Sequence, residues 1–128
     1  MRLLLDTHAL VWWWTDDRRL TPAARAAIAD PANTVLVSAA SAWELATKHR
    51  LGKWDAAGPL VEGFDALLRR SRFAPLPITA TEARLAGGMD WAHRDPFDRM
   101  LLAQARDQGM ALVSGDAVFQ GCDVPVVW

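Results

Sequence analysis

Short uninterrupted apolar runs recur along the chain, and most are separated by segments that carry helix signals. The run Leu3–Leu5 is the clearest, because it contains no polar alternation. Such runs are typical of parallel strands that are buried on both faces of a sheet. Strands are predicted at residues 3–5, 34–38, 76–78, 111–114 and 124–127. Pro77 places the third of these at a sheet edge or a strand end.

The intervening segments are predicted to be helices at residues 8–14, 22–29, 41–51, 59–68, 80–88 and 96–108. Thr21 before Pro22 and Asp95 before Pro96 are typical N-terminal caps, and Thr79 to Glu82 fits a capping box. Gly109 is expected to end the last helix in a left-handed conformation. This alternation predicts a single α/β domain spanning residues 1–128, with a mainly parallel sheet covered on both faces.

The composition is globular, with 52% hydrophobic and 23% charged residues among 128. No apolar stretch reaches the roughly 20 residues of a membrane helix, and the acidic Asp6 comes too early for a secretory signal. Cys122 is the only cysteine, so no internal disulfide can form, and we expect it to be a packing residue. A reducing cytoplasm, with no membrane association, is the expected location.

The net charge of −1 excludes the bulk basic character of a nonspecific nucleic-acid binder. Any contact with phosphates must come from local groups of basic residues. Two such groups are Arg69, Arg70 and Arg72, and Lys48, Arg50 and Lys53. Solvated helix faces explain both groups equally well.

Acidic residues follow three of the predicted strands. Asp6 ends the first strand, Glu44 lies in the helix after the second, and Asp116 comes just after the strand at 111–114. The carboxyl ends of parallel strands share one edge of a sheet, where functional crevices form. We therefore expect these carboxylates to gather there, joined by Asp98 if the start of its helix faces the same edge.

Each acid also has a purely structural interpretation. Asp6 could cap the next helix, Ser41 and Glu44 could form a capping box, and Asp116 could serve a turn. Asp98 differs from the others, because it continues the apolar stripe of its helix, formed by Leu101, Leu102 and Ala105. Burying a carboxylate on this stripe costs free energy unless a partner compensates its charge. Because Asp95 can cap the helix, Asp98 is free to point into a site.

Several carboxylates within a few ångströms cannot all remain ionised without a compensating charge. Oxygen ligands without Cys or paired His favour Mg²⁺ or Mn²⁺ over Zn²⁺. A metal-activated water could then attack a phosphodiester in line. His8 and His93 are possible substrate-positioning residues, although a lone His is more often structural.

Four blocks of the sequence resemble PIN-domain nucleases, and more narrowly the VapC-type toxins of toxin–antitoxin modules. The blocks are residues 3–8, 37–44, 93–105 and 114–116. They occur in the same order over nearly the whole chain. The Ser-Ala-Trp-Glu and Arg-Asp-Pro-Phe-Asp-Arg blocks are specific, whereas Ser-Gly-Asp alone is weak, and many relatives have Thr in place of its Ser.

The resemblance implies a three-layer α/β/α sandwich with a mainly parallel central sheet, and an endoribonuclease that uses Mg²⁺ or Mn²⁺. It also implies a homodimer and a small cognate antitoxin that often places an Arg or Lys at the active site. Carried over, the acidic quartet that binds metal and catalyses RNA cleavage is Asp6, Glu44, Asp98 and Asp116. The residues expected to support this quartet are Asp95, Thr7, Ser41 and Ser114.

Trp12, Trp13 and Trp14 span about 200° of a helix, so they cannot all face one core. At least one is expected to pack inside. Another could lie at a subunit or antitoxin interface, where Trp is enriched, or in a peripheral core under a loop.

Two other functions are open to the same residues. Asp6 before Thr7 superficially suggests the nucleophile of an aspartyl-phosphate phosphatase, but His8 stands where that chemistry wants a second acid. Alternatively, the fold is a non-catalytic interaction module whose acids only cap helices. In that case metal would not raise the melting temperature.

Overall fold

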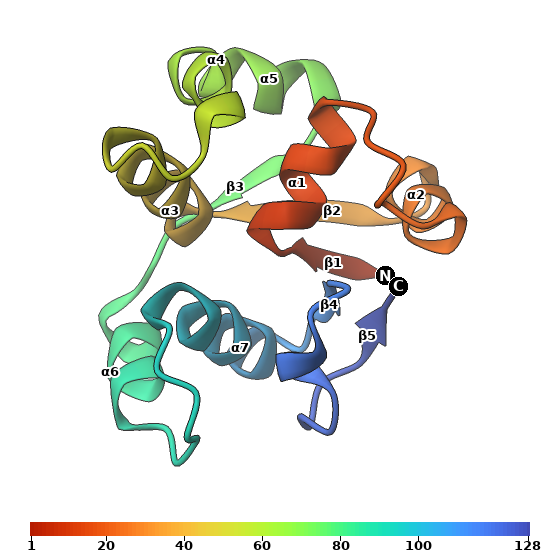
Figure 1. Cartoon of the computed structure of the whole chain (residues 1–128). Helices are drawn as coiled ribbons and strands as arrows, with labels where there is room; N and C mark the ends of the chain where they lie inside the picture. Colours follow the sequence, from red (N-terminus) through yellow and green to blue (C-terminus); the bar gives the residue numbers. More distant parts are fainter.

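The computed structural model describes all residues from Met1 to Trp128 and contains one five-stranded sheet (Figure 1). The strands are β1 (Arg2–Leu5), β2 (Thr34–Ser38), β3 (Ala74–Leu76), β4 (Ala111–Val113) and β5 (Val126–Val127). Their order is β3-β2-β1-β4-β5, and all neighbouring strands are parallel. The prediction of a mainly parallel sheet is confirmed, with β1 at its centre.

Seven helices cover this sheet. They are α1 (Thr7–Trp14), α2 (Pro22–Ala29), α3 (Ala39–Arg50), α4 (Gly58–Glu62), α5 (Phe64–Ser71), α6 (Ala80–Gly88) and α7 (Pro96–Gln108). Two short 3-10 turns, η1 (Asp55–Ala57) and η2 (Ala117–Phe119), complete the elements. No helix is long and apolar enough to cross a membrane.

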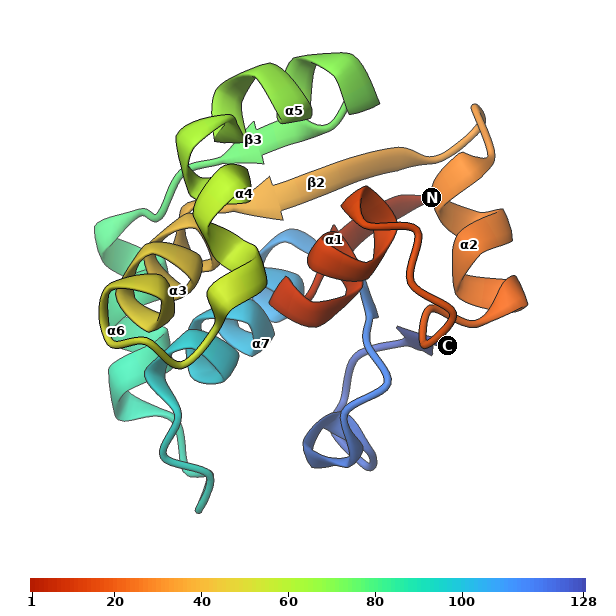
Figure 2. The same ribbon diagram turned by 45° about the horizontal axis from the view of Figure 1, so that its top comes forward.

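The three layers follow from the alternation of side chains along β1. Leu3 and Leu5 are fully buried against helices α1, α2, α4 and α5, whereas Leu4 is fully buried on the other face against α7. Helix α6 packs on α7, outside the sheet. Figures 1 and 2 show this division, with α6 and α7 on one side of the sheet and α1 on the other.

The predicted helix caps are confirmed where the signal is local. Thr21 caps α2 and Thr79 forms a reciprocal capping box with Glu82 at α6. Asp95 caps α7, and Gly109 ends that helix with a φ of 65°. These motifs need only neighbouring residues, so tertiary packing does not override them.

The predicted start of the third helix is wrong. Helix α3 begins at Ala39 rather than near Ser41, and its cap is Ser38, whose hydroxyl accepts from the N–H of Ala40 at 3.0 Å. Ser41 lies inside the helix and is completely buried, where its Oγ accepts from the Thr7 hydroxyl at 3.0 Å. Ser41 and Glu44 therefore do not form a capping box, and helix capping does not explain the glutamate at position 44.

Two further boundaries differ from the prediction. The apolar stripe at 59–68 is divided between α4 and α5 by Gly63, which leaves the helical conformation at φ −96° and ψ 12° and has a low helix propensity. Strand β3 lies two residues earlier than expected and includes Pro75. Because β3 pairs with β2 alone, it is an edge strand that tolerates proline.

The three consecutive tryptophans leave α1 in different directions. Trp13 packs near Phe73, with ring centroids 6.1 Å apart, and Trp14 packs edge-on against Phe64 at 5.3 Å. These two residues are partly buried against the core, which supports the peripheral-core interpretation for them. Trp12 instead faces the edge of the sheet that carries the acidic residues, as described below.

Candidate active site

Asp6 follows the last residue of the central strand and precedes α1. One carboxylate oxygen, Oδ1, accepts from the N–H of Ala9 at 2.6 Å, and Oδ2 accepts a hydrogen bond from the Ser114 hydroxyl. The side chain is almost completely buried. Asp6 is thus a helix cap and a site carboxylate at the same time, because its two oxygens serve different partners.

Asp116 lies in the turn after β4, two residues beyond Ser114. Its N–H donates to the Ser114 Oγ at 3.1 Å, and its Oδ1 accepts from the N–H of Val118 at 3.0 Å. Asp116 itself is exposed. The Ser114 hydroxyl therefore connects this turn to Asp6 on the neighbouring strand.

Asp98 lies in the first turn of α7 and is half-buried. Asp95 performs the capping, because its Oδ1 accepts from the N–H groups of Phe97 at 2.8 Å and Asp98 at 3.1 Å. The Asp98 carboxylate is free for other contacts and lies 2.7 Å from the Nε2 of His93. Leu101 and Leu102, one turn further on, are buried as the apolar stripe predicts.

Glu44 lies on α3 and is buried, with only 4% of its surface exposed. Its Oε2 forms an ion pair with the Nζ of Lys48, one helical turn later. Just before it along the helix, Ser41 accepts the hydrogen bond from Thr7 that joins α3 to α1. Because it is buried and is not a cap, Glu44 needs the positive charge that Lys48 supplies.

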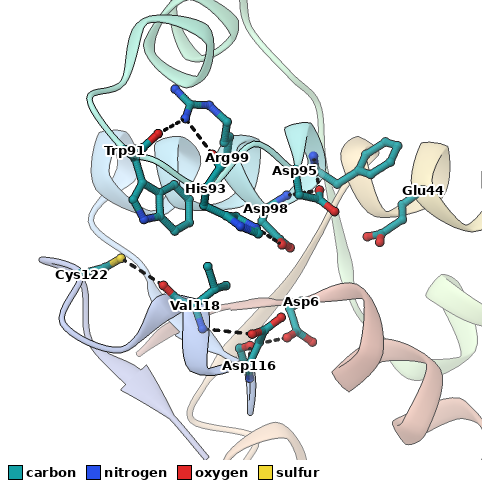
Figure 3. Close-up of polar contacts among 12 residues, drawn as sticks. Asp6, Glu44, Trp91, His93, Asp95, Asp98, Arg99, Asp116, Val118 and Cys122 are labelled. Atoms are coloured by element: carbon teal, nitrogen blue, oxygen red, sulfur yellow. Dashed lines mark hydrogen bonds and ion pairs between the residues drawn. The ribbon is translucent and has the colours of Figure 1, made fainter.

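The four acids come from different elements and face a common space. Figure 3 shows the carboxyl groups of Asp6, Asp98 and Asp116 turned toward one another, with Glu44 directed toward the same space from the side. Asp95, by contrast, has its carboxylate occupied at the start of α7. Sheet order explains the placement of Asp6, Glu44 and Asp116, since β2, β1 and β4 are adjacent and parallel, whereas Asp98 comes from the first turn of α7.

The pKa of Asp6 is raised to about 6, chiefly by burial and to a lesser extent by the negative charges of Asp116 and Glu44. Hydrogen bonds from Ser114 and from the Ala9 N–H act in the opposite direction, because they stabilise the charged form. Because the charges of Asp116 and Glu44 affect the pKa of Asp6, the three carboxylates lie close enough to interact electrostatically. An added positive charge beside Asp6 would stabilise its ionised form.

Burial also raises the pKa of Asp98 to about 6, with further contributions from the charges of Asp95 and Glu44 and an opposing hydrogen bond from His93. The pKa of His8 is lowered by burial, although the negative charges around it act to raise it. Glu44, Asp116 and Asp98 are all among those charges. His8 therefore lies close enough to the acidic residues for their charges to act on its pKa.

The donor set suits a hard divalent cation, because it consists of carboxylate and hydroxyl oxygens without a cysteine. The raised pKa values of Asp6 and Asp98 also favour a cation, since its positive charge would offset the burial and the like charges that raise them. No three His, Cys, Asp or Glu side chains form a ready-made metal cluster as the side chains stand. The residues thus fit such an ion in their chemistry.

Two functional contacts were not predicted from the sequence. The ion pair of Lys48 with Glu44 has a signal that could have been found, namely the spacing of four residues on one helix face. The contact of His93 with Asp98 has no periodic signal, because His93 precedes α7 in an irregular loop. Lys48 therefore belongs to the site rather than to a purely solvated basic face.

Comparisons with known proteins agree with this geometry. The family model described as PIN domain matches residues 3–124. The chain is 31% identical over 116 residues to Ribonuclease VapC22 of Mycobacterium tuberculosis, covering 89% of this chain and 86% of that protein. It is 41% identical over 54 residues to Ribonuclease VapC16 of the same organism, covering 42% and 38% of the two chains.

Solved structures show the same fold at low sequence identity. The crystal structure of M. tuberculosis VapC20, described as a Sarcin-Ricin loop cleaving toxin, aligns with a TM-score of 0.66 at 18% identity over 95% of each chain. Rickettsia felis VapBC2, bound to a promoter DNA fragment, aligns with a TM-score of 0.60 at 14% identity over 98% of this chain and 97% of that one. With a family model that spans most of its length and a VapC ribonuclease that matches nine-tenths of it, the chain belongs to the PIN-domain family, among the VapC-type ribonuclease toxins.

Proposed function

We propose that this chain is a divalent-metal-dependent endoribonuclease and that residues 1–128 form one nuclease domain. The observation that carries the proposal is the gathering of Asp6, Glu44 and Asp98 at one sheet edge, where burial and like charge raise the pKa values of Asp6 and Asp98. The ribonuclease relatives support RNA as the substrate.

Asp6, Glu44, Asp98 and Asp116 are the residues that would hold the cation, and Mg²⁺ or Mn²⁺ is the expected ion. Once bound, the cation supplies positive charge that attracts a phosphodiester and stabilises the charge developing during cleavage. Asp95 supports the site without contacting the cation, because its carboxylate already accepts hydrogen bonds from backbone N–H groups in the first turn of α7.

The chain's own contacts set the orientation of these carboxylates. The Ser114 hydroxyl and the Ala9 N–H fix both oxygens of Asp6. His93 fixes one oxygen of Asp98. The hydrogen bond from Thr7 to Ser41 ties α1 to α3, which carries Glu44. Groups held in this way lose little freedom when a substrate phosphate arrives, which favours catalysis.

We also propose that a small cognate antitoxin inhibits the enzyme, that the enzyme is a homodimer, and that it acts in the cytoplasm. The VapC family membership and the solved VapBC2 assembly support an antitoxin partner. Exposed apolar side chains of Trp43, Leu51 and Leu85 offer surface for protein contacts. Light scattering of the purified chain, alone and with its antitoxin, tests the stoichiometry.

RNA cleavage by the purified chain tests the proposed activity. Activity should require added Mg²⁺ or Mn²⁺ and be abolished by a chelator. Asp6→Asn and Asp98→Asn should each reduce the rate by at least about 100-fold, the scale expected when a group that organises transition-state charge is lost. Asp107→Asn makes the same chemical change at an exposed position on α7 and is the matched control.

Titrating Mg²⁺ against Mn²⁺ in the same assay identifies the preferred ion. Full activity of both site variants, or undiminished cleavage in the chelator, would contradict the proposed function. Loss of activity in Asp107→Asn as well would show that the assay reports a general effect of removing charge rather than the site.

A further inference from the structure

A pocket opens directly beside the acidic site, and aromatic rings form much of its lining. Its volume is about 450 Å³, and Asp6 and Asp116 line it together with His8, Trp12 and Trp128. This volume lies in the range of pockets that bind small molecules, roughly 300–1,000 Å³. The proposed metal chemistry uses the two acids and leaves the rings without a role.

The rings form a continuous strip along the carboxylates. Ring centroids are 5.8 Å apart between Trp12 and Trp128, 5.5 Å between His8 and Trp12, and 4.8 Å between His8 and Trp54. The three tryptophans are partly buried and packed against the core, which holds their rings in place. The strip therefore presents preformed aromatic surface beside the site.

Gly115 allows the indole of Trp128 to pack closely against the backbone just before Asp116. A Cβ at position 115 would overlap the five- and six-membered rings of this indole. The glycine lacks a positive φ, so backbone conformation does not require it. Close approach of Trp128 is the physical reason for a glycine here, and the wall of the pocket depends on it.

Positive charges lie over the same rings. The guanidinium of Arg19 is 4.8 Å from the ring centroid of Trp12 and also lines the pocket. Arg19 is exposed, and it donates to both carboxylate oxygens of Asp17, which hold it beside the pocket. The Nζ of Lys48 lies 5.6 Å from the ring of Trp54 at the other end of the strip.

We propose that this pocket binds a nucleobase of the RNA substrate next to the scissile phosphate, stacked on Trp12 or Trp128, with Arg19 contacting the backbone. Stacking on aromatic side chains beside a basic rim is how proteins hold single-stranded nucleic acid. An inhibitory protein side chain could fill the apolar part, but it would not use together the rings, Arg19 and the adjacent acids proposed to hold the cation. This inference rests on the proposed ribonuclease function and names the part of the substrate that the site recognises.

Binding of nucleosides without metal is the direct test. Adenosine, guanosine, cytidine and uridine carry no phosphate, so the unneutralised acids do not repel them. Titrations followed by NMR of the indole N–H signals should show that at least one nucleoside binds, whereas ribose binds roughly 5- to 150-fold more weakly, the range for one stacked base. Ribose binding as tightly as every nucleoside would overturn the proposal.

Variants connect this binding to Trp12. Trp12→Leu should weaken nucleoside binding and lower kcat/KM for RNA by roughly the same factor, and Trp12→Phe should restore most of both. Trp43→Leu is the matched control, because Trp43 is 59% exposed and packs against Phe97 outside this pocket. Gly115→Ala should act like Trp12→Leu, because it displaces the indole of Trp128. Unchanged nucleoside binding in both Trp12→Leu and Gly115→Ala would overturn the proposal, because neither Trp12 nor Trp128 could then be the stacking ring.

Failure of this inference and failure of the proposed function give different results. Asp98→Asn should reduce cleavage at least about 100-fold and leave nucleoside binding intact, because Asp98 does not line the pocket. Base-dependent binding in a chain that does not cleave RNA would reject the nuclease function and keep the pocket. Metal-dependent cleavage without any base-dependent binding would reject the pocket and keep the nuclease.

Discussion

The hydroxyl of Ser114 donates a hydrogen bond to the carboxylate of Asp6, although the two residues are 108 positions apart in the chain. Pairing of Leu5 with Val113 puts β1 and β4 in a register that brings both strand ends level. The N–H of Asp6 also donates to the carbonyl of Val113 at 3.0 Å. Two neighbouring strands thus deliver a carboxylate and its donor to the same point.

Ser114→Ala should raise the pKa of Asp6 above its value of about 6, because the hydrogen bond from Ser114 stabilises the charged form. Mg²⁺ binding at pH 7 should weaken by about 10-fold, since a hydrogen bond to a charged group is worth roughly 1.5–3 kcal/mol. Carboxyl NMR titration and metal titration measure the two effects. Ser114→Thr keeps the hydroxyl and should restore both, and an unchanged Asp6 pKa in Ser114→Ala would contradict the assignment.

The metal-free protein should lose stability as pH rises from about 4 to about 6. Asp6 has a folded pKa of about 6 against a reference of 3.8, so in this window the folded state holds a proton that the unfolded state has released. Below the window both states are protonated, and above it the full cost of burying the charge is present. For Asp6 this cost is on the order of 3 kcal/mol.

Comparison with Asp6→Asn isolates this contribution. The asparagine keeps a capping oxygen but carries no charge, so the metal-free variant should be more stable than the natural chain at pH 7. The difference should shrink toward pH 4, where Asp6 is protonated. Urea unfolding at a series of pH values measures it, and a difference that does not vary with pH would argue against the raised pKa.

Divalent metal should stabilise the folded chain. At a concentration 100 times the dissociation constant, linkage predicts about 2.7 kcal/mol, or a rise in Tm of roughly 5–15 °C for a chain of this size. The rise should be much smaller in Asp98→Asn and unchanged in Asp107→Asn. Thermal unfolding with and without Mg²⁺ gives the values, and no metal-dependent rise in the natural chain would favour a non-catalytic module.

Arg99 should be required for the geometry around Asp98. Its guanidinium donates to the carbonyls of Ala86 at 2.9 Å and Met89 at 2.6 Å. It also donates to the carbonyls of Trp91 at 2.7 Å and His93 at 2.9 Å (Figure 3), and so organises the loop before α7. Arg99→Met leaves these carbonyls without a donor and should cost about 3 kcal/mol or more in unfolding free energy.

Arg99→Lys should not restore this stability, because one ammonium cannot span donors arranged in a planar fork. Arg94→Met is the control, since Arg94 is exposed in the same loop. The same variants report on His93, whose ring should lose its fixed contact with Asp98 when the loop loosens. An Arg99→Met protein with the natural Tm and the natural pKa of Asp98 would refute the role.

Local signals in the sequence were sufficient for most elements. The strand at 34–38 and the helix at 96–108 have the predicted boundaries, and Thr21, Thr79 and Asp95 are caps as expected. The break at Gly63 was missed because the apolar stripe continues across it and hides the change of direction. The cap at Ser38 was missed because Ser41 offers an equally good local motif.

The sequence by itself determined the alternation of strands and helices, the buried central run at Leu3–Leu5 and the placement of acids after strands, because these follow from neighbouring residues. Only the tertiary structure decided that Ser114 donates to Asp6, that Lys48 pairs with a buried Glu44 and that Trp128 lies over Gly115. Strand order and register bring residues together across more than a hundred positions. Burial and repulsion at the point where they meet then set the charges on which the chemistry depends.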